Sequence, residues 1–394
     1  MVSKRSKILI ALVTISLLLI SLVGCTKKDE NTQKTPIKIG FFAPITGPAA
    51  ADGQSVLNAA KLAVENINKQ GGINGREIEL VYYDDQLDSK QAVSIAQKLT
   101  TKDGVVAVIS GSYSGPTRAV APIFEKAKIP MISAYGVHPD ITKGGDYVFR
   151  QSFIGPIQGK AGAYLAVNML KAKRIAILHM DNDFGTSLAD AFKQKAEELG
   201  ATITSVNPFA MGEKEFTPLL TKIKQENPDA IYLVAYAGEG AQIVRQAKSL
   251  NIKAQLIGTE GVDSTTQFLQ VAGKDAEGLI ITTNLDRDSD RQVVKDFLSQ
   301  YKEKFGFAPD MVAASTYDAF MVLAHVMKKY GTNPDQIKDG MYQVKDFDGV
   351  TGIIKGYNKL GEVTKAVQVQ IVKNGEFHHY GVIDDPSIIT PPEQ

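Results

Sequence analysis

A short run of hydroxyl-bearing residues, Ser-Gly-Ser-Tyr-Ser at positions 110–114, lies between a buried apolar stretch and a helical stretch. The apolar stretch, 105–109, is typical of a buried strand, and Pro116 stands near the first turn of the helix. The first N–H groups of a helix lack partners inside it, and the helix dipole adds positive potential, so this position favours an anion. Ser114 is therefore a candidate to bind a carboxylate. Alternatively, Ser114 or Gly115 only caps the helix, and the two roles are compatible.

Two aromatic residues and one acid stand at or just past the ends of later predicted strands. These residues are Phe184, Tyr236 and Glu260, and the strands span 174–179, 230–236 and 255–258. Open α/β sheets bind ligands beyond the carboxyl ends of their strands, which places all three where a ligand would lie. Core packing is the commoner fate of an aromatic residue. The alternative for Glu260 is a loop carboxylate that only faces water.

Motifs for catalysis and metal binding are missing from the sequence. It has no phosphate-binding loop, no dinucleotide-binding glycine pattern, no His-Glu-x-x-His and no Gly-x-Ser-x-Gly. Residues 181–185 weakly resemble a calcium loop, but the sixth position lacks glycine and the twelfth is Phe192. His378-His379 is expected on a surface strand rather than in a metal site. We therefore predict a protein that is not an enzyme and that uses no metal and no cofactor.

The composition is that of an ordinary soluble globular protein. The chain has 394 residues, of which 44% are hydrophobic, and this length suggests two or three domains. Lys and Arg number 44 against 43 Asp and Glu, so the charge gives no reason to expect nucleic acid as a partner. Cys25 is the only cysteine, which excludes an intramolecular disulfide.

Residues 1–24 have the pattern of a secretory signal peptide. Cations at positions 4, 5 and 7 precede an uncharged apolar stretch, 8–23, which is followed by Gly24. A transmembrane helix is the alternative, but the stretch is shorter than the ~20 residues that span a bilayer. Leu22-Val23-Gly24-Cys25 also resembles the bacterial lipobox, which implies that Cys25 becomes the lipid-bearing N-terminus. Without residues 1–24, 41 Lys and Arg face 43 acids, a net charge of −2. Residues 25–36 then form a flexible tether.

From residue 37 onward, short apolar strands alternate with amphipathic helices. This order is typical of a parallel sheet with helices on both faces. In the first unit we predict strands at 37–42, 77–83, 105–109 and 129–133, and helices at 55–68, 89–99 and 116–127.

The same alternation restarts after residues 153–156, which indicates a second doubly wound unit. Two such units that face each other form a cleft suited to hinge closure around a small molecule. In addition to the three strands already named, the second unit has predicted strands at 202–206 and 278–283 and helices at 157–170, 185–199, 216–225 and 241–250. Two more helices, 293–305 and 313–330, and a hairpin of 366–372 and 377–383 around Asn374-Gly375 complete the chain.

Several stretches in this order resemble the branched-chain amino-acid binding proteins of ABC importers. The resemblance covers nearly all of the chain from residue 37 onward. Its motifs are IGFFAPITGP at 39–48, GGINGR at 71–76, YDD at 83–85, PMIS at 130–133, GEKEF at 212–216 and GTEG at 258–261. It implies an α/β fold of two doubly wound parallel-sheet lobes joined by a three-strand hinge. We expect the first lobe to comprise 37–154 and 285–361, and the second 155–284 and 362–394.

The resemblance also implies ligand contacts. Ser114, with Tyr113 beside it, matches the serine that holds the ligand carboxylate, and Glu260 matches the acid that pairs with the ligand ammonium. Phe184 and Tyr236 match aromatic residues, usually tyrosine, of the second lobe. All five of these residues are expected to contact the ligand.

Three departures from the family pattern leave the ligand open. At 135–137 relatives carry a small residue, Ala and a ligand-binding Thr, whereas this chain has Tyr135, Gly136 and Val137, which keep the backbone groups but lose the hydroxyl. Asp52 replaces an aromatic wall, so it either binds a cationic or hydroxyl-bearing ligand or faces water. Met311 and Val312 stand where an aromatic residue often closes the pocket, so they either leave space for a larger ligand or belong to the core.

The expected function is that of a lipid-anchored solute-binding protein on the outer face of the cell membrane. As a monomer it would capture a small amino acid, branched-chain or related, and deliver it to ABC permease subunits. An aromatic acid, another carboxylate or an amide are alternative ligands, and a ligand sensor for a signalling partner is an alternative role.

Overall fold

The computed structural model describes residues 35–393. The predicted signal peptide, Cys25 and residues 26–34 of the predicted tether lie outside the described residues. The described residues from Pro36 onward belong to one compact unit.

The first sheet is parallel and has the strand order β2-β1-β3-β4-β5 within the described chain. Its central strands are buried on both faces, as expected for a sheet that helices cover on both sides. Val148–Arg150, the edge strand β5, was not predicted. The strands are β1 (Ile37–Ala43), β2 (Ile78–Asp84), β3 (Ala107–Ser110), β4 (Met131–Ser133) and β5 (Val148–Arg150).

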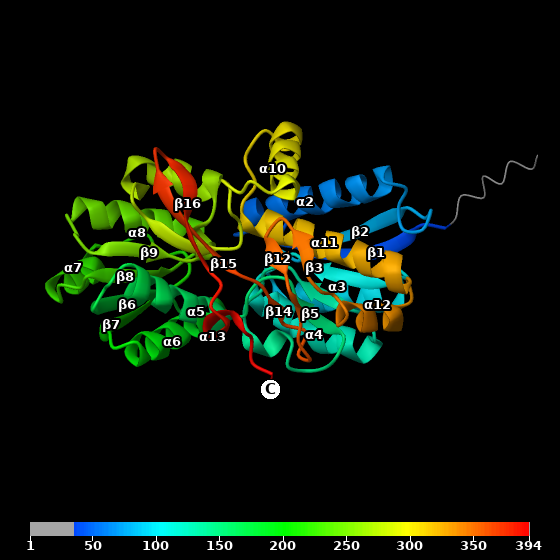
Figure 1. The fold of residues 1–394 in the computed structure, drawn as a ribbon, viewed down its shortest axis with the longest axis horizontal. Helices are drawn as coiled ribbons and strands as arrows, with labels where there is room; N and C mark the ends of the chain where they lie inside the picture. The colour runs from blue at the N-terminus through cyan, green and yellow to red at the C-terminus, as the bar shows by residue number, and fades with distance from the viewer. Residues whose placement is uncertain (1–34, 394) are drawn as a thin grey trace, which may run out of the picture. The chain divides into compact units, whose positions relative to one another are not determined.

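Helices cover both faces of this sheet (Figure 1). Helices α2 (Ala50–Lys69) and α11 (Met311–Tyr330) pack together on one face, and α3 (Ser89–Thr101) and α4 (Ser114–Ala127) pack together on the other. Helix α11 lies far from α2 in the sequence, so a late part of the chain returns to the first sheet. We call the first sheet with its helices the first lobe.

The second sheet contains five parallel strands and an antiparallel hairpin along one edge. Its order is β16-β15-β10-β9-β8-β6-β7. The predicted hairpin turn is confirmed: Asn374 and Gly375 both have positive φ, 53° and 77°, as a tight two-residue turn requires. The strands are β6 (Arg174–Met180), β7 (Thr202–Phe209), β8 (Ala230–Val234), β9 (Gln255–Gly258), β10 (Ile280–Thr283), β15 (Val367–Lys373) and β16 (Glu376–Ile383).

Two pairs of helices cover this second sheet, one pair on each face (Figure 1). Helices α5 (Gly155–Tyr164) and α6 (Asp183–Glu198) share one apolar core, and α7 (Thr217–Gln225) and α8 (Ala237–Ser249) share the other. A π-helical turn, η2 (Leu165–Met169), continues α5 over the rest of the predicted helix. The second sheet with these helices is the second lobe.

Between residues 35 and 393 the chain passes from one lobe to the other three times, after β5, after β10 and before β15. This is the three-segment hinge that the resemblance implies. The exact lobe boundaries that we expect stay a prediction.

The remaining elements are helices and small hairpins. They are η1 (Pro139–Ile141), η3 (Glu260–Val262), η4 (Thr265–Leu269), α9 (Gln270–Ala272), η5 (Gly273–Ala276), α10 (Gln292–Phe305), α12 (Pro334–Met341), β11 (Phe347–Gly349), β12 (Gly352–Ile354), β13 (Gly356–Tyr357), β14 (Val363–Thr364) and α13 (Pro386–Ile389).

Candidate functional site

A cavity lies where the two lobes meet. Residues from both lobes line it, and most of the predicted ligand contacts are among them. The predicted residues at the cavity wall are Asp52, Tyr113, Ser114, Tyr135, Phe184, Tyr236 and Glu260. Gly136 and Val137 do not line it.

Ser114 is the first residue of α4 and is almost completely buried. Its hydroxyl oxygen accepts hydrogen bonds from the backbone N–H groups of Val137 (3.0 Å) and His138 (3.3 Å). Both bonds use the oxygen as acceptor, so the hydroxyl proton stays available for an acceptor in the cavity. The residue at the helix cap is Tyr113, and its side chain makes no capping bond. The Ser114 side chain therefore does not cap α4 in this structure, and its hydroxyl stands at the cavity wall.

Of the segment 135–137, Tyr135 lines the cavity, whereas Gly136 and Val137 do not. The Tyr135 hydroxyl donates to the carbonyl of Gly111 (2.7 Å), and the Gly136 N–H donates to the Ser133 hydroxyl (3.1 Å). The Val137 N–H is taken by Ser114. The expectation that Gly136 and Val137 contact a ligand is thus not met in this structure, because protein acceptors already use both N–H groups.

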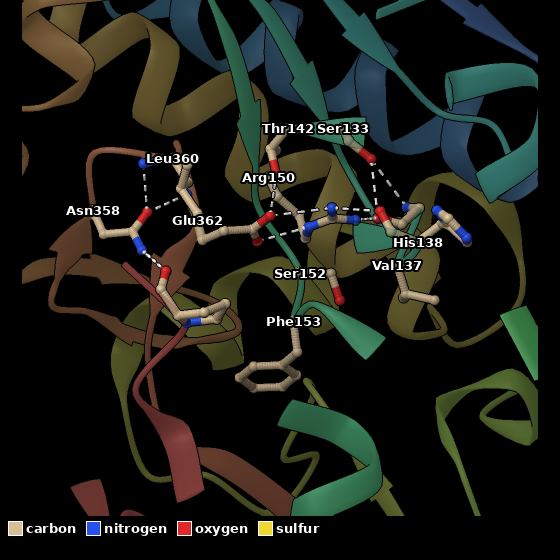
Figure 2. A network of polar contacts seen from close by, with 12 residues as sticks. Ser133, Val137, His138, Thr142, Arg150, Ser152, Phe153, Asn358, Leu360 and Glu362 are labelled. Carbon is tan, nitrogen blue, oxygen red and sulfur yellow. Dashed lines mark hydrogen bonds and ion pairs between the residues drawn. The ribbon is translucent and has the colours of Figure 1, made fainter. Parts of the chain in front are cut away.

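A buried ion pair holds this segment in place (Figure 2). The Arg150 guanidinium bonds to Glu362 at 2.8 Å, and both side chains are almost fully buried. The same guanidinium donates to the backbone carbonyls of Gly136 and His138. Arg150 therefore fixes the backbone whose N–H groups orient the Ser114 hydroxyl. Sequence reasoning missed this pair, since no motif links two residues that lie 212 positions apart.

On the second lobe, Glu260 follows β9 and is only 4% exposed. Its carboxylate accepts hydrogen bonds from Gln158 (2.6 Å), Ser152 (3.3 Å) and Asn284 (3.2 Å). Within residues 35–393 no cation forms an ion pair with it, and burial raises its pKa to about 7, although the charge of Lys365 acts in the opposite direction. Glu260 is therefore a buried carboxylate at the cavity wall and not a solvated loop carboxylate.

Four aromatic rings continue across the cavity from one lobe to the other. Phe184 and Tyr236 stack with ring centroids 5.1 Å apart, and Tyr236 lies 4.5 Å from Tyr113 of the first lobe. Tyr113 then meets Tyr135 edge-on at 6.0 Å. Phe184 and Tyr236 also pack against the core of the second lobe, so for these two residues core packing and a place at the cavity wall are combined.

Asp52 also joins the two lobes. It lies in the first turn of α2, and its carboxylate accepts hydrogen bonds from the Tyr113 hydroxyl (2.6 Å) and from the Gln267 amide of the second lobe (2.5 Å). Burial raises the pKa of Asp52, and the two hydrogen bonds partly offset this effect. Asp52 therefore faces the cavity and its wall rather than open water.

Sequence reasoning missed two further acids at the cavity wall, Asp263 and Asp310. Asp263 is neutralised by an ion pair with Arg287. Asp310 caps α11 by accepting from the Ala313 N–H (2.9 Å). Burial, and secondarily the charge of Asp52, raise the pKa of Asp310 to about 7. An acid directly before an apolar helix is a capping signal that could have drawn attention to Asp310.

Comparison with known proteins agrees with this geometry. A family model described as periplasmic binding protein matches residues 36–376. The chain belongs to this family.

Its curated relatives in the periplasmic binding protein family include a leucine-, isoleucine-, valine-, threonine- and alanine-binding protein of Pseudomonas aeruginosa. The two are 30% identical over 329 residues, which cover 83% of this chain and 87% of the relative.

Two solved structures of periplasmic binding proteins are similar over almost their full lengths. A leucine-binding protein from Thermotoga maritima is 32% identical with a TM-score of 0.82, over 89% of this chain and 99% of the other. A branched-chain amino acid transporter substrate-binding protein from Streptococcus pneumoniae, in complex with isoleucine, is 30% identical with a TM-score of 0.82, over 88% and 99% of the two chains. These relatives are solute-binding proteins, so the family is not one of enzymes.

Among residues 35–393, no helix is both long and apolar enough to cross a membrane. No group of three or more His, Cys, Asp or Glu side chains there is placed to hold a metal ion.

Proposed function

We propose that the protein is an extracytoplasmic solute-binding lipoprotein that captures a small amino acid, branched-chain or related, between its lobes and delivers it to an ABC importer. One observation carries the proposal: Ser114 and Glu260 line the same cavity from opposite lobes. Ser114 offers a hydroxyl proton at a helix N-terminus, and Glu260 offers a buried carboxylate without an ion-pair partner among the described residues. These are the two poles that a zwitterionic amino acid needs. The amino-acid ligands of the relatives in Pseudomonas aeruginosa and Streptococcus pneumoniae support it.

Capture would proceed by closure of the lobes. A ligand that contacts both Ser114 and Glu260 makes its full set of bonds only in the closed form, so it shifts the population toward that form. The chain between the lobes consists of three short segments, a suitable hinge for this motion. A permease that recognises the closed form would then receive only the loaded protein. This role needs no catalytic step, and we propose that the protein is not an enzyme.

Lipid attachment would keep the protein near its permease. Cys25 is the proposed attachment point, and residues 26–36 are the proposed tether. The localisation that follows is the outer face of the cell membrane, and one monomer is enough to form the cleft. Mass spectrometry of the membrane fraction tests this part: a diacylglyceryl group on Cys25 is expected, and a chain that begins before residue 25 would contradict it.

Isothermal titration calorimetry with leucine, isoleucine, valine, threonine and alanine tests the binding function. We expect at least one amino acid to bind with a Kd of about 1 μM or lower. Ser114→Ala and Glu260→Gln should each weaken its binding, whereas the matched surface variants Ser94→Ala and Glu376→Gln, both at exposed positions, should not. Equal affinity of the site variants and the controls would contradict the proposed site.

An aromatic carboxylate is the second candidate ligand, and the four rings at the cavity wall favour it. Such a ligand carries no ammonium group. Titration with 4-hydroxybenzoate therefore separates the candidates: Glu260→Gln should leave the binding of this acid unchanged or strengthen it, while it weakens the binding of an amino acid.

A further inference from the structure

The end of the cavity formed by the first lobe carries two acidic side chains without a balancing cation among the described residues. Asp52 and Asp310 both line it, from α2 and from the start of α11. Neither carboxylate has an ion-pair partner among residues 35–393, in contrast to Asp263, whose charge Arg287 balances. Because no group of described residues is placed to hold a metal, a metal ion does not account for this charge.

One oxygen of Asp310 is free to bind a ligand. The side chain is only 6% exposed, and its Oδ1 accepts from the Ser55 hydroxyl (2.8 Å) and from the Ala313 N–H (2.9 Å). No described residue donates a hydrogen bond to Oδ2. Because Asp310 lines the cavity, this oxygen can accept a hydrogen bond from a ligand there.

The cavity lining next to Asp310 includes two apolar residues. Met311 and Val312 follow Asp310 on α11 and line the same cavity. An alkyl chain with a cationic end fits such a surface, because its methylene groups cover apolar atoms while the cation reaches an acid. A leucine or valine side chain would cover the same surface and leave the Oδ2 of Asp310 without a donor.

We propose that the ligand is a basic amino acid, whose α-ammonium group binds Glu260 and whose side-chain cation binds between Asp310 and Asp52. This inference rests on the proposed function, since it assumes that the zwitterionic end of the ligand lies between Ser114 and Glu260. It specifies the ligand class: lysine, ornithine or arginine in preference to an aliphatic amino acid of similar length.

Calorimetry with lysine and norleucine tests the inference, because lysine is norleucine with an ammonium group in place of one hydrogen on its terminal carbon. We expect lysine to bind at least tenfold more tightly than norleucine, with ornithine and arginine as further cationic ligands. Asp310→Asn should abolish this preference while it keeps the cap of α11, because asparagine also accepts from a helix N–H. Asp52→Asn is the second variant, and Asp190→Asn at an exposed position is the control.

The outcomes separate this inference from the proposed function. If norleucine or leucine binds as tightly as all three basic amino acids, and Glu260→Gln still weakens binding, the basic-ligand inference is wrong and the proposed function stands. If lysine is preferred but Asp310→Asn and Asp52→Asn, both folded by circular dichroism, retain the preference, the assigned subsite is wrong. If no amino acid binds, both proposals fail.

Discussion

The amide of Gln267 donates a 2.5 Å hydrogen bond to the carboxylate of Asp52, and this bond joins the second lobe to the first across the cavity. It lies beside the contact of Tyr113 with Tyr236, and Tyr113 also donates to Asp52. A second bridge between the lobes, the ion pair of Arg118 and Asp183, is partly exposed. The structure is therefore that of a closed cleft, and these contacts act on the balance between open and closed forms.

Gln267→Glu should weaken ligand binding by about tenfold. The substitution replaces a donor with a second carboxylate opposite Asp52, and like charges at this distance disfavour the closed form. Calorimetry gives the affinity, and small-angle scattering of the ligand-free protein should show a larger radius of gyration. Gln343→Glu makes the same change at an exposed position and serves as the control. An unchanged affinity for the Gln267 variant would show that the bond does not influence closure.

Arg150→Met should destabilise the protein by about 3–5 kcal/mol, because Glu362 is then left buried without its cation. Urea unfolding followed by circular dichroism measures the loss. The control is Lys295→Met, which breaks an exposed ion pair with Asp290 and should leave the midpoint unchanged. A small effect at Arg150 would mean that the pair does not hold the segment behind Ser114.

Val137→Thr should not improve ligand binding, although it restores the hydroxyl that the family resemblance implies. Val137 is 1% exposed and packs in an apolar cluster with Phe153, so the new hydroxyl has no cavity to reach (Figure 2). The buried hydroxyl should cost about 1–3 kcal/mol of stability. Denaturant unfolding and calorimetry on one protein sample give both quantities. A tighter complex would indicate that this segment turns toward the ligand in the loaded state.

The ligand-free protein should lose stability as the pH rises from about 5 to 7, through the effect of Glu260 and Asp310. Their pKa values in the folded protein are raised to about 7, so the folded state keeps protons that the unfolded chain has already released. Each group contributes at most about 1.4 kcal/mol per pH unit. His138 and His325, whose pKa values are lowered, act in the opposite direction below pH 6.5.

The difference between wild type and variants isolates this effect from that of the histidines. Glu260→Gln and Asp310→Asn should each flatten the fall in stability between pH 5 and pH 7, and the exposed-site variant Glu376→Gln should keep it. Thermal unfolding at four pH values is sufficient. Parallel curves for wild type and both site variants would contradict the assignment of raised pKa values to these carboxyl groups.

The alternation of apolar strands and amphipathic helices was enough to predict both sheets and nearly all of the helices that cover them. Local pattern also indicated that Ser114 and Glu260 come shortly after strand ends, which converge at one edge of a sheet, and both residues line the cavity. β5 escaped prediction because it is an edge strand of three residues without a distinct apolar period.

Long-range partners could not be predicted from local pattern. Gln267 meets Asp52 over a separation of 215 residues, and only the assembled lobes bring them together. Gly136 and Val137 follow a strand as the family pattern requires, yet Arg150 and Ser114 use their backbone groups. Whether such a residue faces the cavity or supports it from behind depends on tertiary packing, which the order of residues does not reveal.

The most direct test of the central claim compares the amino acid that binds most tightly with its decarboxylated amine and its deaminated acid. Both poles are needed if the carboxylate binds at Ser114 and the ammonium binds at Glu260, so each analogue should bind at least about 100-fold more weakly by calorimetry. Glu260→Gln should reduce the difference between the amino acid and the deaminated acid. An analogue that binds as tightly as the amino acid would contradict the claim that the cleft recognises a zwitterion.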